Sequence, residues 1–291
     1  MIHFSFQISL GLRYMILSAF GFALMAVCVK YASQQEIPVL EIVAARAIVS
    51  LFLSYIDIRR KKLNLLGVRK GLLFARGLVG TFALFSVYYA LTHMPLAEAT
   101  VLQYLHPMFT AVLAVIFLKE KMKWPVLISI VFSFIGLLCI ARPDFLFGVS
   151  KIQFSSLAVL AATVGAFGSA VAYVLVRKLN ETEDPSVIIF YFPLIALPIS
   201  IVLMGDQFVL PDLRSSFVLL LVGIFTQVGQ VGLTKSMQTE TASRATSLSY
   251  LQVAIAAILG WLFFNEVPDF WVWIGAGFIL LGALINIFWK K

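Results

Sequence analysis

Polar side chains recur on one face of an otherwise apolar stretch near residues 96–118. Helical spacing brings Thr100, Gln103, His106 and Thr110 together, with Pro107 beside them. A polar stripe that faced lipid would be costly, so this face is expected to meet protein or water. A second apolar stretch near 243–264 repeats the pattern. Its polar members are Thr246, Ser249 and Gln252.

The two polar faces are predicted to form opposite walls of a cavity, with Tyr104 and Tyr250 at its edges. The alternative is hydrogen bonding between helices, which Thr, Ser and Gln commonly provide in membrane bundles. Pro107 cannot donate a backbone hydrogen bond and so exposes the carbonyl of Gln103. It is expected either to act as a hinge or a coordinating kink, or simply to bend the helix.

Gln227 and Gln230 lie near the middle of a third apolar stretch, 216–235. Their side chains are uncharged, and each amide both donates and accepts hydrogen bonds. They suit a zwitterionic or amide-bearing ligand and are assigned, with Gln103, Tyr104, His106, Tyr250 and Gln252, to the predicted cavity.

Two arginines fall inside apolar stretches. Arg46 lies within 39–57, and an arginine at that depth is a functional hypothesis that needs a named partner. The partner is either a substrate carboxylate or phosphate, or the carbonyls of a helix end. Arg76 is closer to a membrane boundary and can extend its head group to water, so a structural role is expected for it.

The composition requires a lipid environment for these stretches. Hydrophobic residues make up 61% of the 291 residues and charged residues only 12%, and the mean hydropathy is +0.99. A soluble domain is roughly half apolar and a quarter charged. About 20 apolar residues in a helix span a bilayer. Ten such segments are predicted, near 12–31, 39–57, 71–91, 96–118, 124–141, 155–176, 186–204, 216–235, 243–264 and 270–288.

The positive charges predict the orientation of these segments. With the N-terminus inside, 16 of the 22 Lys and Arg residues fall on the inner side, four on the outer side and two within the membrane. Cytoplasmic loops collect Lys and Arg, so both termini are predicted to face the cytoplasm of a bacterium, across its inner membrane. The net charge of +8 is confined to short loops, which argues against a nucleic-acid partner. Nothing indicates an oligomeric state.

Few residues are suited to catalysis or metal binding. The two cysteines, Cys28 and Cys139, lie in apolar segments and form no metal motif. No zinc motif, nucleophile elbow, paired carboxylates or nucleotide-binding loop occurs. We therefore expect neither an enzyme nor a cofactor. A channel would need a selectivity filter or a ring of like charges, which a two-fold repeat in one chain supplies poorly.

An internal repeat relates the two halves of the chain. At an offset of 146 residues, 14 of the 43 positions in 98–140 are identical to those in 244–286, including Tyr104/Tyr250 and Glu120/Glu266. An offset of 147 places Lys30 on Arg177. Five helices per half is an odd number, so the second half enters the membrane with opposite polarity. The predicted fold is an all-α integral membrane protein of two inverted five-helix repeats, 1–145 and 146–291.

Several sequence blocks resemble the EamA-type carriers of the drug/metabolite transporter superfamily. The resemblance covers nearly the whole chain. The blocks are MPLAEATVLQYLHPMFTAVLAVIFLKEKM (94–122), FIGLLCIARP (134–143), RGLVGTFALFSVYYAL (76–91), GQVGLTKSM (229–237) and FFNEVPDFWVWIGAGFILLG (263–282). The resemblance implies ten helices around a central cavity, and substrates that include amino acids, other small metabolites and S-adenosylmethionine. One departure is Arg46, whose position in the second half is occupied by Pro193.

We therefore expect a transporter of small polar or zwitterionic metabolites that works by alternating access. Amino acids, related compounds and S-adenosylmethionine-like molecules remain open as substrates. No carboxylate lies at mid-depth, since Glu41, Asp57 and Glu98 are near membrane boundaries. This favours a facilitator or exchanger over an ion-driven carrier. A proton-coupled exporter of amino acids or drugs, with His106 as the titrating group, is the alternative, and a non-transporting membrane subunit is another.

Overall fold

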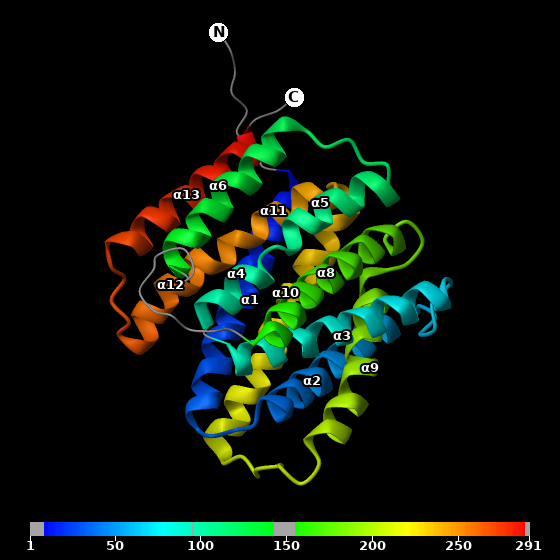
Figure 1. Ribbon diagram of the computed structural model, residues 1–291. Coiled ribbons are helices and arrows are strands. Elements are labelled where there is room, and N and C mark those ends of the chain that lie inside the picture. The colour runs from blue at the N-terminus through cyan, green and yellow to red at the C-terminus, as the bar shows by residue number, and fades with distance from the viewer. Residues whose placement is uncertain (1–8, 95, 143–154, 289–291) are drawn as a thin grey trace.

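The computed structural model describes residues 9–94, 96–142 and 155–288, and all regular elements in these ranges are helices (Figure 1). Ten helical stretches of the described chain are long and apolar enough to cross a membrane. The ten predicted segments are confirmed. The predicted boundary between the halves, at 145/146, lies outside the described residues. The helices are α1 (Leu10–Gln34), α2 (Val39–Arg60), α3 (Lys70–His93), α4 (Leu96–Gln103), α5 (His106–Phe117), α6 (Trp124–Ala141), α8 (Ser156–Leu179), α9 (Pro185–Met204), α10 (Leu213–Thr239), α11 (Ala242–Ser247), the 3₁₀ turn η1 (Leu248–Tyr250), α12 (Leu251–Phe264) and α13 (Phe270–Phe288).

Local sequence signals set several helix ends. Asp184 precedes α9 and accepts a hydrogen bond from the backbone N–H of Ser186 at 2.9 Å. Asp212 caps α10 in the same way, through the N–H of Ser215 at 2.8 Å. Such side-chain acceptors satisfy N–H groups that have no partner inside the helix. Gly205 follows α9 with a φ of 53°, a conformation that glycine adopts without a steric penalty.

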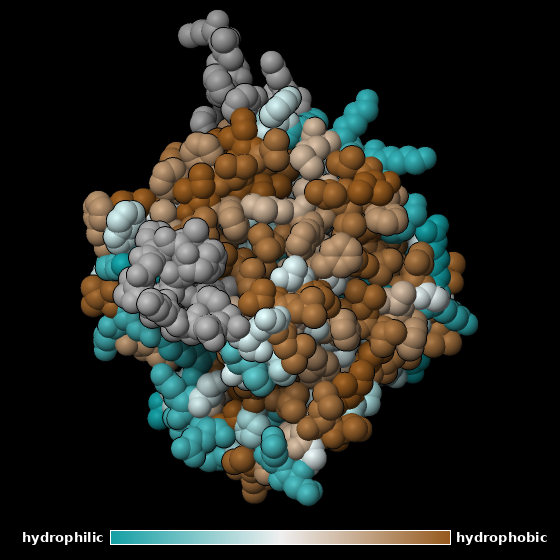
Figure 2. All heavy atoms as spheres, viewed as in Figure 1, coloured by the Kyte–Doolittle hydropathy of each residue, from teal (hydrophilic) through white to brown (hydrophobic). Residues whose placement is uncertain are grey.

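Large apolar side chains cover the outside of the bundle. Phe52, Phe82, Ile116, Val202 and Leu262 are all exposed. Figure 2 shows hydrophobic residues over most of the visible face, with hydrophilic residues gathered toward its margins. A surface of this kind is stable in contact with lipid chains rather than water.

The two halves of the chain are interlaced rather than packed as separate bundles. Helix α1 of the first half packs along α10 of the second, and α8 of the second half packs along α3 of the first. Two further extensive contacts pair α2 with α9 and α6 with α13, and these helices lie side by side in Figure 1. Each of these four contacts joins one half to the other, so any space between the halves is lined by both.

Small residues allow α6 and α13 to approach each other closely. A Cβ atom added to Gly136 of α6 would lie 2.5 Å from the carbonyl oxygen of Gly275 of α13, and the converse distance is also 2.5 Å. No side chain fits at either position. In lipid, packing of this type holds helices together, because burial of apolar surface from water contributes little there.

Loops 61–69 and 118–123, which are rich in basic residues, lie at one end of the bundle, called here the basic end. The acidic loop 180–184 lies beside them. Lys61 forms ion pairs with Asp57 and Asp184, at 2.8 and 3.0 Å. The pKa of Asp184 lies below its usual value. Burial alone would raise this pKa, but hydrogen bonds with the N–H of Ser186 and with Lys61 lower it. Glu183 accepts hydrogen bonds from the N–H groups that precede α3, at 2.8 and 2.5 Å. These contacts join the loop before α3 to the loop before α9.

Candidate substrate cavity

The helices that carry the polar stripes are both interrupted near mid-membrane. In the first half, α4 ends at Gln103 and α5 begins at His106, directly before Pro107. In the second half, the 3₁₀ turn η1 separates α11 from α12 and ends at Tyr250. Tyr104 and Tyr250 are related by the 146-residue offset, so the interruptions are equivalent. Discontinuous helices of this kind place backbone polar groups beside a buried site.

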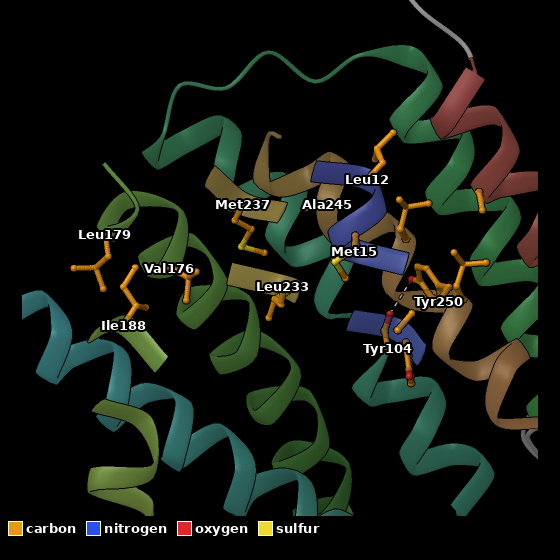
Figure 3. Close-up of a cluster of buried hydrophobic side chains, with 14 of the residues drawn as sticks. Leu12, Met15, Tyr104, Val176, Leu179, Ile188, Leu233, Met237, Ala245 and Tyr250 are labelled. Carbon is orange, nitrogen blue, oxygen red and sulfur yellow. Dashed lines mark hydrogen bonds between the residues drawn. The ribbon is translucent and has the colours of Figure 1, made fainter. Parts of the chain in front are cut away.

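A direct hydrogen bond joins the two interruptions. The Tyr250 hydroxyl donates to the backbone carbonyl of Tyr104 at 2.8 Å, and the two ring centroids are 5.6 Å apart. Figure 3 shows this bond at the edge of the buried core. Tyr250 is fully buried. It therefore satisfies a carbonyl at the interruption of the opposite half, and its own hydroxyl is not free to bind a ligand.

A cavity of about 180 Å³ lies beside these interruptions. Its walls come from both halves, and none of the described lining residues is acidic. The lining residues are Phe22, Met25, Arg46, Arg76, Gly80, Leu84, Val87, Gln103, Tyr104, His106, Ser169, Ala172, Tyr173, Phe192, Gln230 and Gln252.

Most of the residues assigned to the cavity from the sequence meet in this one space. Six of them line it, namely Arg46, Gln103, Tyr104, His106, Gln230 and Gln252. The two others do not. Gln227 donates from Nε2 to Ser54 Oγ at 2.9 Å and so links α10 to α2. Tyr250 is occupied by the carbonyl of Tyr104.

The structure corrects the expectation for Arg76. Its side chain does not extend to water, because only 3% of the residue is exposed and it lines the cavity. Its guanidinium carbon lies 5.1 Å from the ring centroid of Phe192. That of Arg46, which is 8% exposed, lies 5.7 Å from the same centroid. Two cations thus flank one aromatic ring, and Phe192 gave no signal in the sequence beyond its place next to Pro193.

The cavity lining also presents polar atoms without protein partners. His106 Nδ1 and Gln230 Oε1 are buried and make no hydrogen bond with any described residue. The His106 ring packs edge-on against Tyr173, with centroids 5.3 Å apart. Unpaired buried polar atoms are expensive, so a ligand or water is expected to pair with them.

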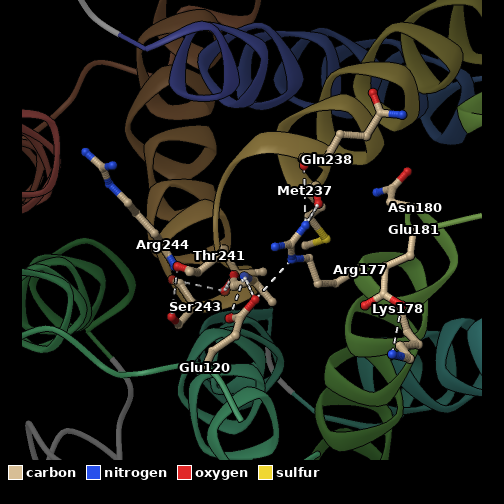
Figure 4. Close-up of polar contacts among 12 residues, drawn as sticks. Glu120, Arg177, Lys178, Asn180, Glu181, Met237, Gln238, Thr241, Ser243 and Arg244 are labelled. Atoms are coloured by element: carbon tan, nitrogen blue, oxygen red, sulfur yellow. Dashed lines mark hydrogen bonds and ion pairs between the residues drawn. The ribbon is translucent and has the colours of Figure 1, made fainter. Parts of the chain in front are cut away.

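A bridge between the two halves lies at the basic end. Arg177 Nε pairs with Glu120 Oε1 at 3.0 Å and its Nη1 donates to the carbonyl of Met237 at 2.9 Å (Figure 4). Glu120 also accepts from the N–H of Ala242 at 2.9 Å.

The repeat-related pair lies at the opposite end, where Lys30 contacts Glu266. Lys30 and Arg177 are equivalent positions, as are Glu266 and Glu120. The inverted repeat thus places one ion pair at each end of the cavity.

The described residues contain no group of three or more His, Cys, Asp or Glu side chains that could hold a metal ion. Both cysteines are free thiols. The cavity lining itself offers cationic, aromatic and hydrogen-bonding side chains for recognition of a ligand.

The chain is similar in sequence to a family of known membrane proteins. The EamA-like transporter family model matches residues 9–142 and 156–288. The Pseudopaline exporter CntI of Pseudomonas aeruginosa is 32% identical over 278 residues, which cover 95% of each chain. Solute carrier family 35 member G1 of Homo sapiens is 34% identical over 280 residues, covering 92% of this chain and 76% of that one.

Two further similarities agree with this assignment. The S-adenosylmethionine uptake transporter of Rickettsia conorii is 29% identical over 222 residues, covering 74% of this chain and 71% of that protein. A solved structure described only as "Crystal structure of protein" matches with a TM-score of 0.76 at 16% identity, covering 92% of this chain and 95% of that one. The latter supports the fold alone. The chain belongs to the EamA-like transporter family, and is accordingly a multi-pass membrane transporter and not an enzyme.

Proposed function

We propose that the protein carries small polar metabolites across the membrane by alternating access at the cavity beside the two helix interruptions. The observation that carries the proposal is that interrupted helices of both inverted halves meet at one buried polar space. In transporters built from inverted repeats, substrate binds at this place and the two halves rock around it.

The substrate class follows from the relatives and the cavity together. The names of two relatives specify pseudopaline export and S-adenosylmethionine uptake, so members of this family move small metabolites in opposite directions. For this chain we propose amino acids or related compounds, bound by Arg46, Gln103, His106, Gln230 and Gln252, with Pro107 at the hinge.

Transport is proposed to be a facilitated or exchange process rather than an ion-driven one. The two acidic residues of α2, Glu41 and Asp57, each have a partner that lies outside the cavity lining. Glu41 Oε2 accepts from the N–H of Val209 at 3.0 Å, and Asp57 pairs with Lys61. A coupling carboxylate must be reached from both sides in turn, and neither residue lines the cavity.

The protein is proposed to lie in a bacterial inner membrane with both termini in the cytoplasm, so that the basic end faces the cytoplasm. The positive loop charge supports this orientation. The proposed partners are the metabolite and the lipid bilayer, with no nucleic acid.

Counterflow in proteoliposomes tests the proposal. Vesicles preloaded with an unlabelled amino acid should accumulate the same labelled amino acid transiently without any ion gradient, with glutamine and glutamate as the first probes. Protein-free vesicles are the control. Accumulation that requires an imposed proton gradient, in the wild type and in His106→Gln alike, would contradict uncoupled exchange. A cysteine introduced into the cavity lining should react with thiol reagents from both sides of the membrane. If it reacts from one side only, the proposal of alternating access fails as well.

A further inference from the structure

We propose that Arg46, Arg76 and Phe192 form an anion-binding subsite, and that the transported metabolite is a small organic anion with two oxyanionic charges. This inference rests on the carrier function proposed above and narrows its substrate class to acidic compounds, so that only the acidic amino acids among those proposed would fit. The shared chemistry is a dicarboxylate or a phosphate ester, because a guanidinium binds both through paired N–H groups.

Neither of the two buried arginines has a compensating negative charge beside it in the described part of the chain. Neither Arg46 nor Arg76 forms an ion pair or hydrogen bond with any residue that the structure describes, and Nε of Arg76 is buried without a partner. Each guanidinium has five N–H donors. Contact with the face of Phe192 offsets part of the cost of burial, but it satisfies none of those donors in plane. A bound anion would.

The Arg46 and Arg76 guanidinium groups line the same cavity and lie beside the same aromatic ring. The two guanidinium carbons lie 5.7 and 5.1 Å from the centroid of a single ring. Their separation is at most the sum of these distances, and both residues line the cavity. One small molecule with two negative groups can therefore reach both.

Gly80, one helical turn after Arg76, leaves room for the Arg76 guanidinium. A Cβ atom at this position would lie 2.6 Å from Nη1 of Arg76 and 3.1 Å from Cδ2 of Phe192. The guanidinium thus occupies the space that a side chain at residue 80 would need. It points along α3 into the membrane, away from the basic end at which α3 begins.

The rest of the cavity suits the uncharged part of such a ligand. His106 Nδ1 and Gln230 Oε1, from two further lining residues, have no described protein partner and can bind a hydroxyl or amide group. With two cations and no described acidic residue in the lining, the site disfavours a cation. A sulfonium compound such as S-adenosylmethionine is therefore a poor fit for this chain.

Ligand-induced thermal stabilisation of the purified full-length protein tests the subsite at constant ionic strength. The probes are succinate and glycerol 3-phosphate, compared with succinamide, glycerol and putrescine as matched neutral and cationic molecules. We expect at least one anion to raise the melting temperature with concentration, as a ligand of the folded state must, and the uncharged and cationic analogues to have no effect. Equal shifts with succinamide, or no shift with either anion, would overturn the proposal.

Variants identify the residues. Arg46→Gln and Arg76→Gln should each weaken anion binding about thirtyfold or more, the loss typical of truncating one member of a buried charge pair. Arg60→Gln removes the same charge from the exposed end of α2 and should leave affinity within about twofold. Arg46→Lys and Arg76→Lys keep the charge but lose the planar fork, so weaker binding is expected even if the glutamine variants do not fold. Wild-type affinity in both lysine variants would contradict the subsite.

Gly80→Ala supplies a test that leaves both arginines in place. The added methyl group must displace the Arg76 guanidinium, so anion affinity should fall. Gly71→Ala is the control in the same helix, because its Cβ would meet nothing within 4 Å. Equal affinities in these two variants would contradict the placement of Arg76. Counterflow of neutral amino acids that is insensitive to Arg46→Gln and Arg76→Gln would reject the subsite but leave the carrier proposal intact.

Discussion

Individual residues of one type have separate roles in this protein, according to what they contact. Gln227 and Gln230 are three positions apart on α10. Gln227 donates from Nε2 to Ser54 Oγ and does not line the cavity, whereas Gln230 lines it. The Oε1 atoms of both are buried without a described partner. Residues three apart on a helix differ by about 60° in direction, which is enough to place them against different neighbours.

This difference predicts separate effects for the same substitution. Gln230→Ala should lower the transport rate about tenfold or more by removing a cavity hydrogen bond, without changing the melting temperature of the ligand-free protein. Gln227→Ala should instead lower stability by about 1 kcal/mol through loss of the contact with α2, with transport little affected. Proteoliposome flux and thermal melting of the same preparations distinguish the two. A loss of flux in Gln227→Ala with an unchanged melting temperature would place it in the cavity after all.

At the scale of helices, the two repeat-related ion pairs differ in strength. The Lys30 and Glu266 side chains are 42% and 55% exposed, whereas those of Arg177 and Glu120 are 28% and 10% exposed. The pair at the basic end also has backbone partners on α10 and α11. Exposed ion pairs contribute about 0–1 kcal/mol, and hydrogen bonds to charged groups about 1.5–3 kcal/mol. The basic end is therefore closed the more firmly of the two.

Removing this bridge should open the cavity toward the basic end. The reporter is Ser169→Cys in the cavity lining, with Cys28 and Cys139 replaced by serine. Glu120→Gln should raise its labelling from the basic end about tenfold, the factor that 1.4 kcal/mol gives at equilibrium. Glu266→Gln should raise labelling from the opposite end by about threefold or less. Inside-out and right-side-out vesicles supply the two sides of access. Labelling that is unchanged in Glu120→Gln would show that the bridge does not close this end.

At the scale of the whole molecule, the inverted repeat gives the protein two similar ends, and the charge of their loops bears on which end faces which compartment. Val68 lies in a loop of the basic end and is 76% exposed. Val267 lies between α12 and α13 at the opposite end and is 77% exposed. Both positions accept a small side chain without loss of packing, so they can report which end faces which compartment.

The proposed orientation predicts their accessibility. In intact cells, and in a background without Cys28 and Cys139, Val267→Cys should react with an impermeant thiol reagent and Val68→Cys should not. Permeabilised cells should show reaction at both positions, which confirms that each thiol is exposed. Labelling of Val68→Cys from outside intact cells would invert the topology.

The sequence by itself determined the ten spans, the inverted repeat, the family resemblance and six of the sixteen residues that line the cavity. Hydropathy and repeat spacing depend only on the order of residues, so these features are readable without coordinates. Three others required the tertiary structure. The direction of the Arg76 side chain is set by the space beside Gly80 and by the ring of Phe192. The partner of Gln227 is Ser54, on α2. The helix interruption at η1 occurs without any proline. The first two depend on neighbours distant in sequence, Phe192 and Ser54, whose approach is set by packing between the two halves.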